Sequence, residues 1–187
     1  MDRLALSAVL ILTGIVSSVT SQGSDSWSPP VPAKLIALMR ATVPGAEIVR
    51  PDEIDSNSCQ PLASSPTVVQ ANLAGDHRTD FAVLLKLKET GKKTEWHGKT
   101  LTEAQFALML FSDDGHDGYS TRRLDEFTDF VPLGAFVAVD QPGKLHNAST
   151  SKDLTTHHAA VSLVFCEKSE TAYYIHDGKV TAVPISD

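Results

Sequence analysis

Two adjacent histidines, His157 and His158, are the first candidates in this chain for a metal site or a catalytic base. Imidazole is a frequent zinc ligand and changes its charge near neutral pH. A zinc site needs three or four converging ligands, however, and adjacent side chains on a strand point to opposite faces of a sheet. The spacings His-x-His, Cys-x-x-Cys and His-Glu-x-x-His do not occur. The pattern therefore predicts no zinc site and leaves the two histidines as candidates for a dispersed hydrolytic site.

Serine nucleophiles and acidic turns are the next candidates. No Gly-x-Ser-x-Gly elbow, which would expose a nucleophilic serine, is present. Asp113, Asp114 and Asp117 form an acidic group that could mimic a calcium loop. Gly115 occupies a ligand position of such a loop, and Leu124 stands where its final glutamate would be. We therefore interpret this segment as the polar tip of a hairpin and predict no catalytic residue.

The N-terminus has the order of a secretory signal peptide. Arg3 gives a short basic start, and residues 4–19 are mostly apolar but interrupted by Ser and Thr. Val19-Thr20-Ser21 then offers the small residues that a signal peptidase reads. We predict that residues 1–21 are a signal peptide cleaved after Ser21 and that the protein is secreted or periplasmic.

The chain has two cysteines, Cys59 and Cys166. An exported chain folds in an oxidising compartment, where two cysteines ordinarily form a disulfide. The alternative is a pair of buried thiols, since cysteine packs as a small apolar residue. We expect the Cys59–Cys166 disulfide, because no third cysteine competes for either partner.

Charge and length limit the classes of partner. The 187 residues carry a formal net charge of −7, which argues against nucleic acid and against anionic membrane surfaces. No second long apolar run follows the signal segment, so we expect no membrane span in the mature chain. The length fits one domain.

The pattern of apolar residues predicts one helix followed by short strands. Residues 22–31 are rich in Ser, Gly and Pro and predict a flexible lead-in to a single globular domain over 32–187. Apolar residues at helical spacing predict an amphipathic helix over 32–42. Strands are predicted at 67–71, 80–87, 105–111, 119–124, 134–139, 159–166, 172–176 and 179–185. The expected fold class is α+β, an N-terminal helix packed on a mainly antiparallel twisted β-sheet.

One segment carries a resemblance to a known family. Residues 68–85 read VVQANLAGDHRTDFAVLL, with a polar loop between two predicted strands. This segment resembles a single FG-GAP-type unit, known from integrin-like propellers, in which an Asp-x-Asn-x-Asp-Gly-x-x-Asp loop often binds calcium. The C-terminal residues 172–179 and 184–187 are similar to the tail of small exported bacterial proteins that carry one such unit and have no assigned activity.

The resemblance implies a calcium loop whose ligands are Asn72, Asp76 and Asp80. Ala74 stands at a ligand position but has no side-chain oxygen, and His77 stands where the family has glycine. Calcium takes six to eight oxygens, several of them carboxylate, so this set is degenerate. The alternative is that Asn72, Asp76 and Asp80 accept backbone N–H groups in a tight turn, and we favour this interpretation.

These observations predict an exported, non-enzymatic domain that binds a protein or another component of the cell envelope. In this interpretation, the acidic loops at Asp76 and Asp113 form the exposed recognition face. The alternative is an envelope hydrolase with a dispersed His/Asp/Ser site near His157, His158 and the acidic turns.

Overall fold

A long antiparallel sheet forms the base of the molecule. The computed structural model describes residues 27–57 and 66–186. In this sheet, sheet A, the strands follow the order β1-β3-β4-β5, and β2 also pairs with β3. Their bounds are β1 (Glu47–Ile48), β2 (Val68–Ala71), β3 (Asp80–Trp96), β4 (Lys99–Asp113) and β5 (Tyr119–Val131).

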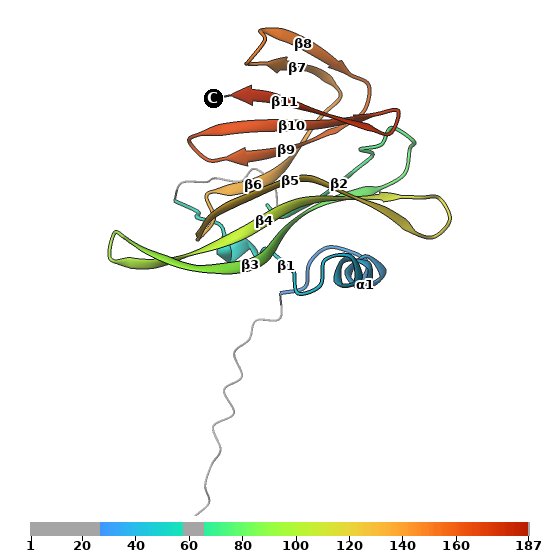
Figure 1. Cartoon of the computed structure of the whole chain (residues 1–187). Coiled ribbons are helices and arrows are strands. Elements are labelled where there is room, and N and C mark those ends of the chain that lie inside the picture. The colour runs from blue at the N-terminus through green and yellow to red at the C-terminus, as the bar shows by residue number, and fades with distance from the viewer. Residues whose placement is uncertain (1–26, 58–65, 187) are drawn as a thin grey trace, which may run out of the picture.

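A second antiparallel sheet, sheet C, lies over one face of sheet A (Figure 1). Its strands follow the order β11-β10-β9-β6, and a two-stranded hairpin of β7 and β8 lies beyond it. The bounds are β6 (Ala135–Asp140), β7 (Gly143–Asn147), β8 (Lys152–Thr156), β9 (Ala160–Phe165), β10 (Ser169–His176) and β11 (Lys179–Ser186).

The main hydrophobic core lies between the two sheets. Leu84 of β3 and the fully buried Phe106 and Leu108 of β4 pack in one cluster with Val137 of β6 and Leu163 of β9. Aromatic rings also cross this interface. Phe127 of β5 stacks on Phe106 with the ring centroids 5.5 Å apart and meets Phe165 of β9 edge-on at 4.9 Å.

The other face of sheet A carries a smaller core. The run of apolar residues from Phe81 to Leu85 is buried on both faces of the strand, as in a central strand covered on each side. The helix α1 (Ala33–Thr42) contributes the buried Leu35 and Met39 to the second cluster, with Phe81, Val83 and Leu85. A 3-10 turn, η1 (Pro51–Glu53), follows β1.

The expectation of an α+β fold is wrong. The described part of the chain is mostly β-sheet, with 60% of its residues in strands and 9% in helix, and its architecture is one of antiparallel sheets rather than a helix packed on a sheet. The predicted helix over 32–42 exists, but it is a single short element. The strands are longer and more numerous than expected because polar segments, which carry no apolar periodicity, also pair.

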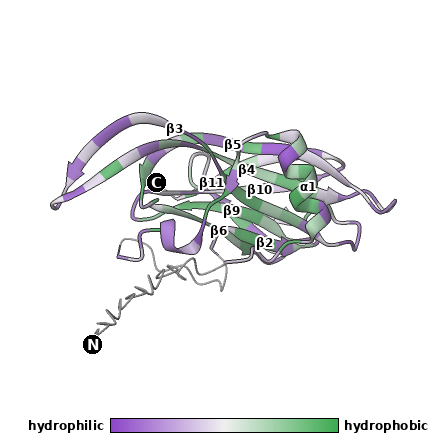
Figure 2. Ribbon diagram, turned by 90° about the horizontal axis from the view of Figure 1, so that it is seen from below, coloured by the Kyte–Doolittle hydropathy of each residue, from purple (hydrophilic) through white to green (hydrophobic). Residues whose placement is uncertain are grey.

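The largest of these unexpected segments is an extension of the β3–β4 hairpin, which we call the arm and define as residues 88–103. Lys93 pairs with Thr102 and Trp96 pairs with Lys99, so the ladder continues to the hairpin tip. Every residue from 88 to 100 is exposed. Figure 2 shows the arm projecting from the more hydrophobic body, with hydrophilic residues along it. The arm therefore adds no residue to the core beyond its base.

One polar contact joins the two sheets within the interface. The Tyr173 hydroxyl of β10 donates a hydrogen bond of 2.5 Å to the Asp125 carboxylate of β5. Tyr173 is buried, and the ladder between β4 and β5 shifts register beside Asp125. Burial, together with this acceptor, raises the pKa of Tyr173 far above its ordinary value. The hydroxyl is thus a fixed donor that ties sheet C to sheet A.

Candidate functional site

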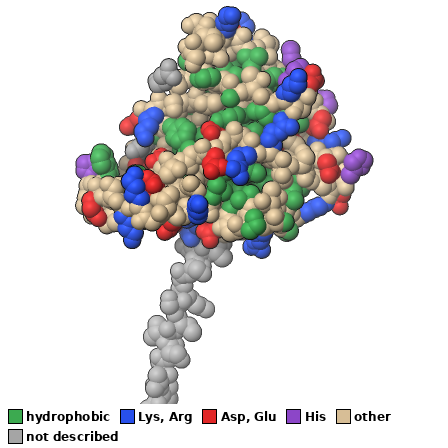
Figure 3. All heavy atoms as spheres, in the orientation of Figure 1, with side chains coloured by type: hydrophobic (Ala, Val, Ile, Leu, Met, Phe, Trp, Pro, Cys, Tyr) green, Lys and Arg blue, Asp and Glu red, His purple; other side chains and the backbone are tan. Residues whose placement is uncertain are grey.

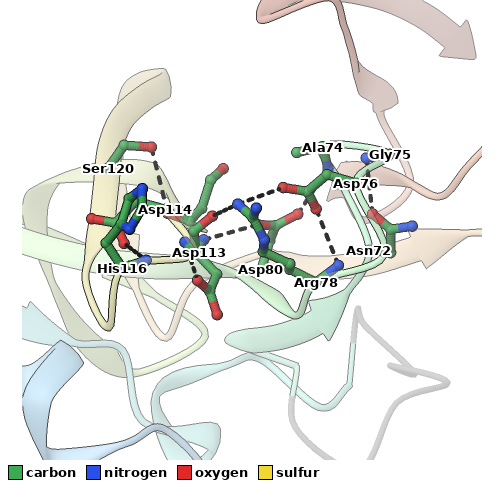
Figure 4. Close-up of polar contacts among 12 residues, drawn as sticks. Asn72, Ala74, Gly75, Asp76, Arg78, Asp80, Asp113, Asp114, His116 and Ser120 are labelled. Atoms are coloured by element: carbon green, nitrogen blue, oxygen red, sulfur yellow. Dashed lines mark hydrogen bonds and ion pairs between the residues drawn. The ribbon is translucent and has the colours of Figure 1, made fainter.

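The three predicted loop ligands all accept backbone N–H groups (Figure 4). Asn72 Oδ1 accepts from the Gly75 N–H at 2.8 Å, and Asp76 Oδ1 accepts from the Arg78 N–H at 3.1 Å. Short polar side chains favour such turns because they replace hydrogen bonds that the backbone of the turn leaves unmade. The turn-capping interpretation is confirmed for these residues.

Asp80 has a larger role, because it joins two loops. Its Oδ2 accepts from the N–H groups of Leu73 and Ala74, each at 2.8 Å, and its Oδ1 accepts from the Asp113 N–H at 3.1 Å. The side chain is fully buried. Burial raises the pKa of Asp80 above its ordinary value, although the three N–H donors act in the opposite direction. Asp80 therefore couples residues 72–80 to residues 113–118, and we call these two segments the loop pair.

Further contacts bind the loop pair together. The Arg78 guanidinium lies 3.3 Å from both the Asp76 carboxylate and the backbone oxygen of Asp113. Gly115 has φ +72, and a Cβ added there would lie 2.6 Å from the guanidinium carbon of Arg78. Lys34 of α1 also reaches Asp117 with an ion pair of 3.0 Å. The acidic turn is indeed a hairpin tip, as predicted, and Asp114 Oδ1 accepts from two of its N–H groups.

Calcium is expected to leave the melting temperature of the protein unchanged at millimolar concentration. Both oxygens of Asp80 and one oxygen each of Asn72 and Asp76 already accept N–H groups, so an ion would have to displace these bonds. A ligand that binds only the native state must raise the melting temperature. A thermal scan with up to about 5 mM calcium, with magnesium as control, tests this. A rise abolished by Asp76→Ala and by Asp80→Ala would show a calcium site.

His157 and His158 lie in a second region, close to the loop of residues 72–80. His157 and His158 line a groove of about 410 Å³ together with Asn72 of the loop. The His158 ring stacks on Tyr174 with centroids 4.6 Å apart, and Tyr174 stacks on His176 at 6.0 Å. A Cβ on Gly75 would lie 2.4 Å from the His158 ring, so this ring also packs against the loop. His158 is thus a packing residue between the loop and β10.

This groove lacks the other groups that a hydrolase needs. Among its described lining residues there is no carboxylate and no hydroxyl side chain. Ser162 donates to Asp140 at 2.6 Å, but Ser162 is fully buried in β9. In the described ranges, 27–57 and 66–186, no group of three or more His, Cys, Asp or Glu side chains could hold a metal ion. The arrangement therefore does not assemble a His/Asp/Ser site from these residues.

A larger groove lies beneath the arm and was not predicted from the sequence. It has a volume of about 690 Å³, and its lining includes residues of the arm, of the end of β5 and of the segment that follows η1. Trp96 and Leu101 of the arm and Phe130 of β5 give it apolar surface. Trp96 is 63% exposed, and the described residues contain no other exposed large hydrophobic side chain.

Polar contacts hold the arm in place above this groove. Glu103 accepts from Lys92 and from the Thr90 hydroxyl, each at 2.8 Å, and these bonds hold the pKa of Glu103 below its ordinary value. Lys92 also lies over the Phe130 ring, 5.4 Å from its centroid. The Trp96 ring meets His97 edge-on at 4.8 Å. The arm thus presents its tip in a defined conformation. The sequence signal that could have indicated this site is a tryptophan next to a His-Gly turn.

The predicted disulfide remains a prediction. Cys59 lies outside the described residues, and Cys166 follows β9, where its N–H donates to the Gly134 oxygen at 2.9 Å. We expect peptide mapping without reductant to recover the peptides of Cys59 and Cys166 as one linked species. In the chain-entropy view such a link stabilises the fold by about 3–5 kcal/mol, so reduction should lower the melting temperature. Two unlinked peptides that react with a thiol reagent after denaturation would contradict the disulfide.

Comparisons with known proteins assign no family. The chain matches no protein-family model, no curated protein and no solved structure. The resemblance of residues 68–85 to an FG-GAP-type unit therefore stays a prediction. No helix in the described part of the chain has the length and the apolar character needed to cross a membrane.

Proposed function

We propose that the mature chain is an exported, non-enzymatic binding module at the cell envelope, and that the arm and the groove beneath it form its binding site. The signal peptide predicted at residues 1–21 lies outside the described residues, so export is part of this proposal. The net charge of −7 makes a nucleic acid an unfavourable partner.

The observation that carries the proposal is the exposed arm with Trp96 at its tip. Residues 88–100 are all exposed, so ordering this segment gains little from apolar burial, although it loses conformational entropy. Exposed aromatic side chains on projecting segments are typical of recognition sites. A volume of about 690 Å³ also lies within the range of ligand sites.

The acidic loops were the expected recognition face, and their contacts support a different use. The side-chain oxygens of Asn72, Asp76 and Asp80 accept N–H groups of the loop pair itself, and Arg78 neutralises Asp76. These contacts support a structural role for the loop pair, at the opposite end of sheet A from the arm (Figure 1). We therefore assign the binding role to the arm and not to the acidic loops.

The test removes the arm and leaves the body. Replacing residues 90–103 with Asn-Gly joins the paired residues Glu89 and Ala104 through a two-residue turn. We expect the shortened protein to fold, to be recovered outside the cytoplasm with an N-terminus near Gln22, and to lose sedimentation with isolated bacterial envelopes. Lys179→Ala, at the exposed start of β11 and next to the turn that contacts Arg122 of β5, should bind envelopes as the unchanged protein does. Equal sedimentation of the shortened and unchanged proteins, or a cytoplasmic chain with an intact N-terminus, would overturn the proposal.

A further inference from the structure

We propose that the groove beneath the arm binds an uncharged segment of an oligosaccharide. This inference rests on the proposed function, because it names the class of ligand for the same site. It follows from three properties of the groove: the face of the hairpin that lines it, the balance of its charges, and the presence of both apolar and polar groups.

One wall of the groove is the face of a paired ribbon. Thr94 pairs with Leu101, and Trp96 pairs with Lys99. Directly opposed residues of an antiparallel pair have their side chains on the same face, so these four side chains form one surface. All four line the groove. An extended peptide recognised through its main chain needs an unpaired strand edge, whereas these four side chains present the face of a paired ribbon.

The formal charges of the described lining residues cancel. Lys99 and Lys168 contribute two positive charges, and Asp55 and Asp129 contribute two negative charges. A strongly charged ligand would meet as many like charges as opposite ones, and like charges in contact are unfavourable. The surface around it shows the same mixing of signs (Figure 3). The groove therefore suits a neutral ligand that both donates and accepts hydrogen bonds.

Apolar and polar groups occur side by side, which fits the two faces of a sugar ring. The exposed indole of Trp96 can pack against the C–H face of a ring, while carboxylate, amide, hydroxyl and ammonium groups can pair with its hydroxyls. A purely apolar ligand would remove water from the charged groups of Asp129 and Lys99 without offering them polar contacts, which is costly. The groove has a volume of about 690 Å³, which is within the range of ligand sites.

The test follows the fluorescence of Trp96 during titration with neutral oligosaccharides. The chain has two tryptophans, so Trp27→Phe leaves Trp96 as the reporter. We expect chitohexaose or cellohexaose to shift its emission saturably, with a dissociation constant below about 1 mM. In calorimetry, Trp96→Ala should weaken binding by about tenfold or more, Trp96→Phe by less, and Asp129→Asn by several-fold. Lys179→Ala is the matched control and should bind normally.

Three results would overturn the inference. They are binding of heparin or polygalacturonate in preference to the neutral chains, binding of an uncharged peptide of Ser, Thr and Val in their place, and no response to any neutral chain at about 10 mM. If these results appear while the shortened protein still loses envelope binding, the ligand class is wrong and the binding module stands. If envelope binding also survives removal of the arm, both proposals fail.

Discussion

Replacing Asp80 with alanine is expected to lower the free energy of unfolding by about 3–5 kcal/mol, because three backbone N–H groups lose their acceptor at once. Asp80 is fully buried, and its carboxylate receives the N–H groups of Leu73, Ala74 and Asp113. Water can replace only part of these bonds, since Leu73 is itself buried. Urea unfolding followed by circular dichroism, in the absence of calcium, gives the measurement.

A neighbouring carboxylate provides the control. Asp76 is exposed and accepts one N–H group, from Arg78, so Asp76→Ala should cost less than about 1 kcal/mol. Asp80→Asn should fall between the two, because one amide oxygen can still accept while the amide nitrogen faces a donor. Equal effects of Asp76→Ala and Asp80→Ala would show that the coupling of the loop pair through Asp80 contributes nothing to stability.

Replacing Tyr173 with phenylalanine is expected to cost about 1.5–3 kcal/mol. The substitution keeps the ring in the core between the sheets and removes the single donor of the 2.5 Å bond to Asp125. Asp125 then keeps the Glu126 N–H as a partner, at 2.8 Å, but loses its contact with sheet C. Denaturant unfolding of the variant measures this loss.

The same residue gives a pH signature. The pKa of Tyr173 is raised in the folded protein, first by burial and then by the Asp125 acceptor, above the ordinary value of 10.0. The folded state therefore keeps this proton when the unfolded state loses it. Its contribution to stability is complete below pH 10.0 and declines by about 1.4 kcal/mol per pH unit above it. Tyr173→Phe should lack this component of the alkaline decline, and identical pH profiles of the two proteins would contradict it.

The sequence predicted the buried part of the fold better than the exposed part. The apolar run from Phe81 to Leu85 predicts a strand because it must be covered on both faces, and that strand is present. Residues 88–103 are mostly lysine, glutamate and threonine and have no apolar period, since both faces of the arm meet solvent over most of its length. The arm was therefore not predicted, and neither was the groove that depends on it. The hairpin of β7 and β8 was missed for a similar reason, because Leu145 is its only buried apolar residue.

For the candidate sites, local contacts were predicted from the sequence and long-range contacts were not. The capping by Asn72 and Asp76 is local, so turn chemistry alone predicted it. The bond from the Asp113 N–H to Asp80 spans 33 residues, and the packing of His158 on Gly75 joins segments even farther apart. Such contacts depend on how strands from different hairpins meet, which residue types and spacing do not specify. The wrong fold class has a related origin, because the one helix was predicted correctly while the polar strands were not recognised.

The position of β5 at the edge of sheet A affects the tendency of this protein to aggregate at high concentration. An edge strand of this length exposes backbone groups that could pair with another copy of the chain and start aggregation. Arg122, Arg123 and Glu126 lie along β5, and a second copy aligned beside it would have to bury these charges. The Arg122 guanidinium also reaches the Gly178 oxygen at 2.7 Å, which ties the strand to the turn between β10 and β11. The charges of β5 thus oppose pairing of this edge strand with a strand of another copy of the chain.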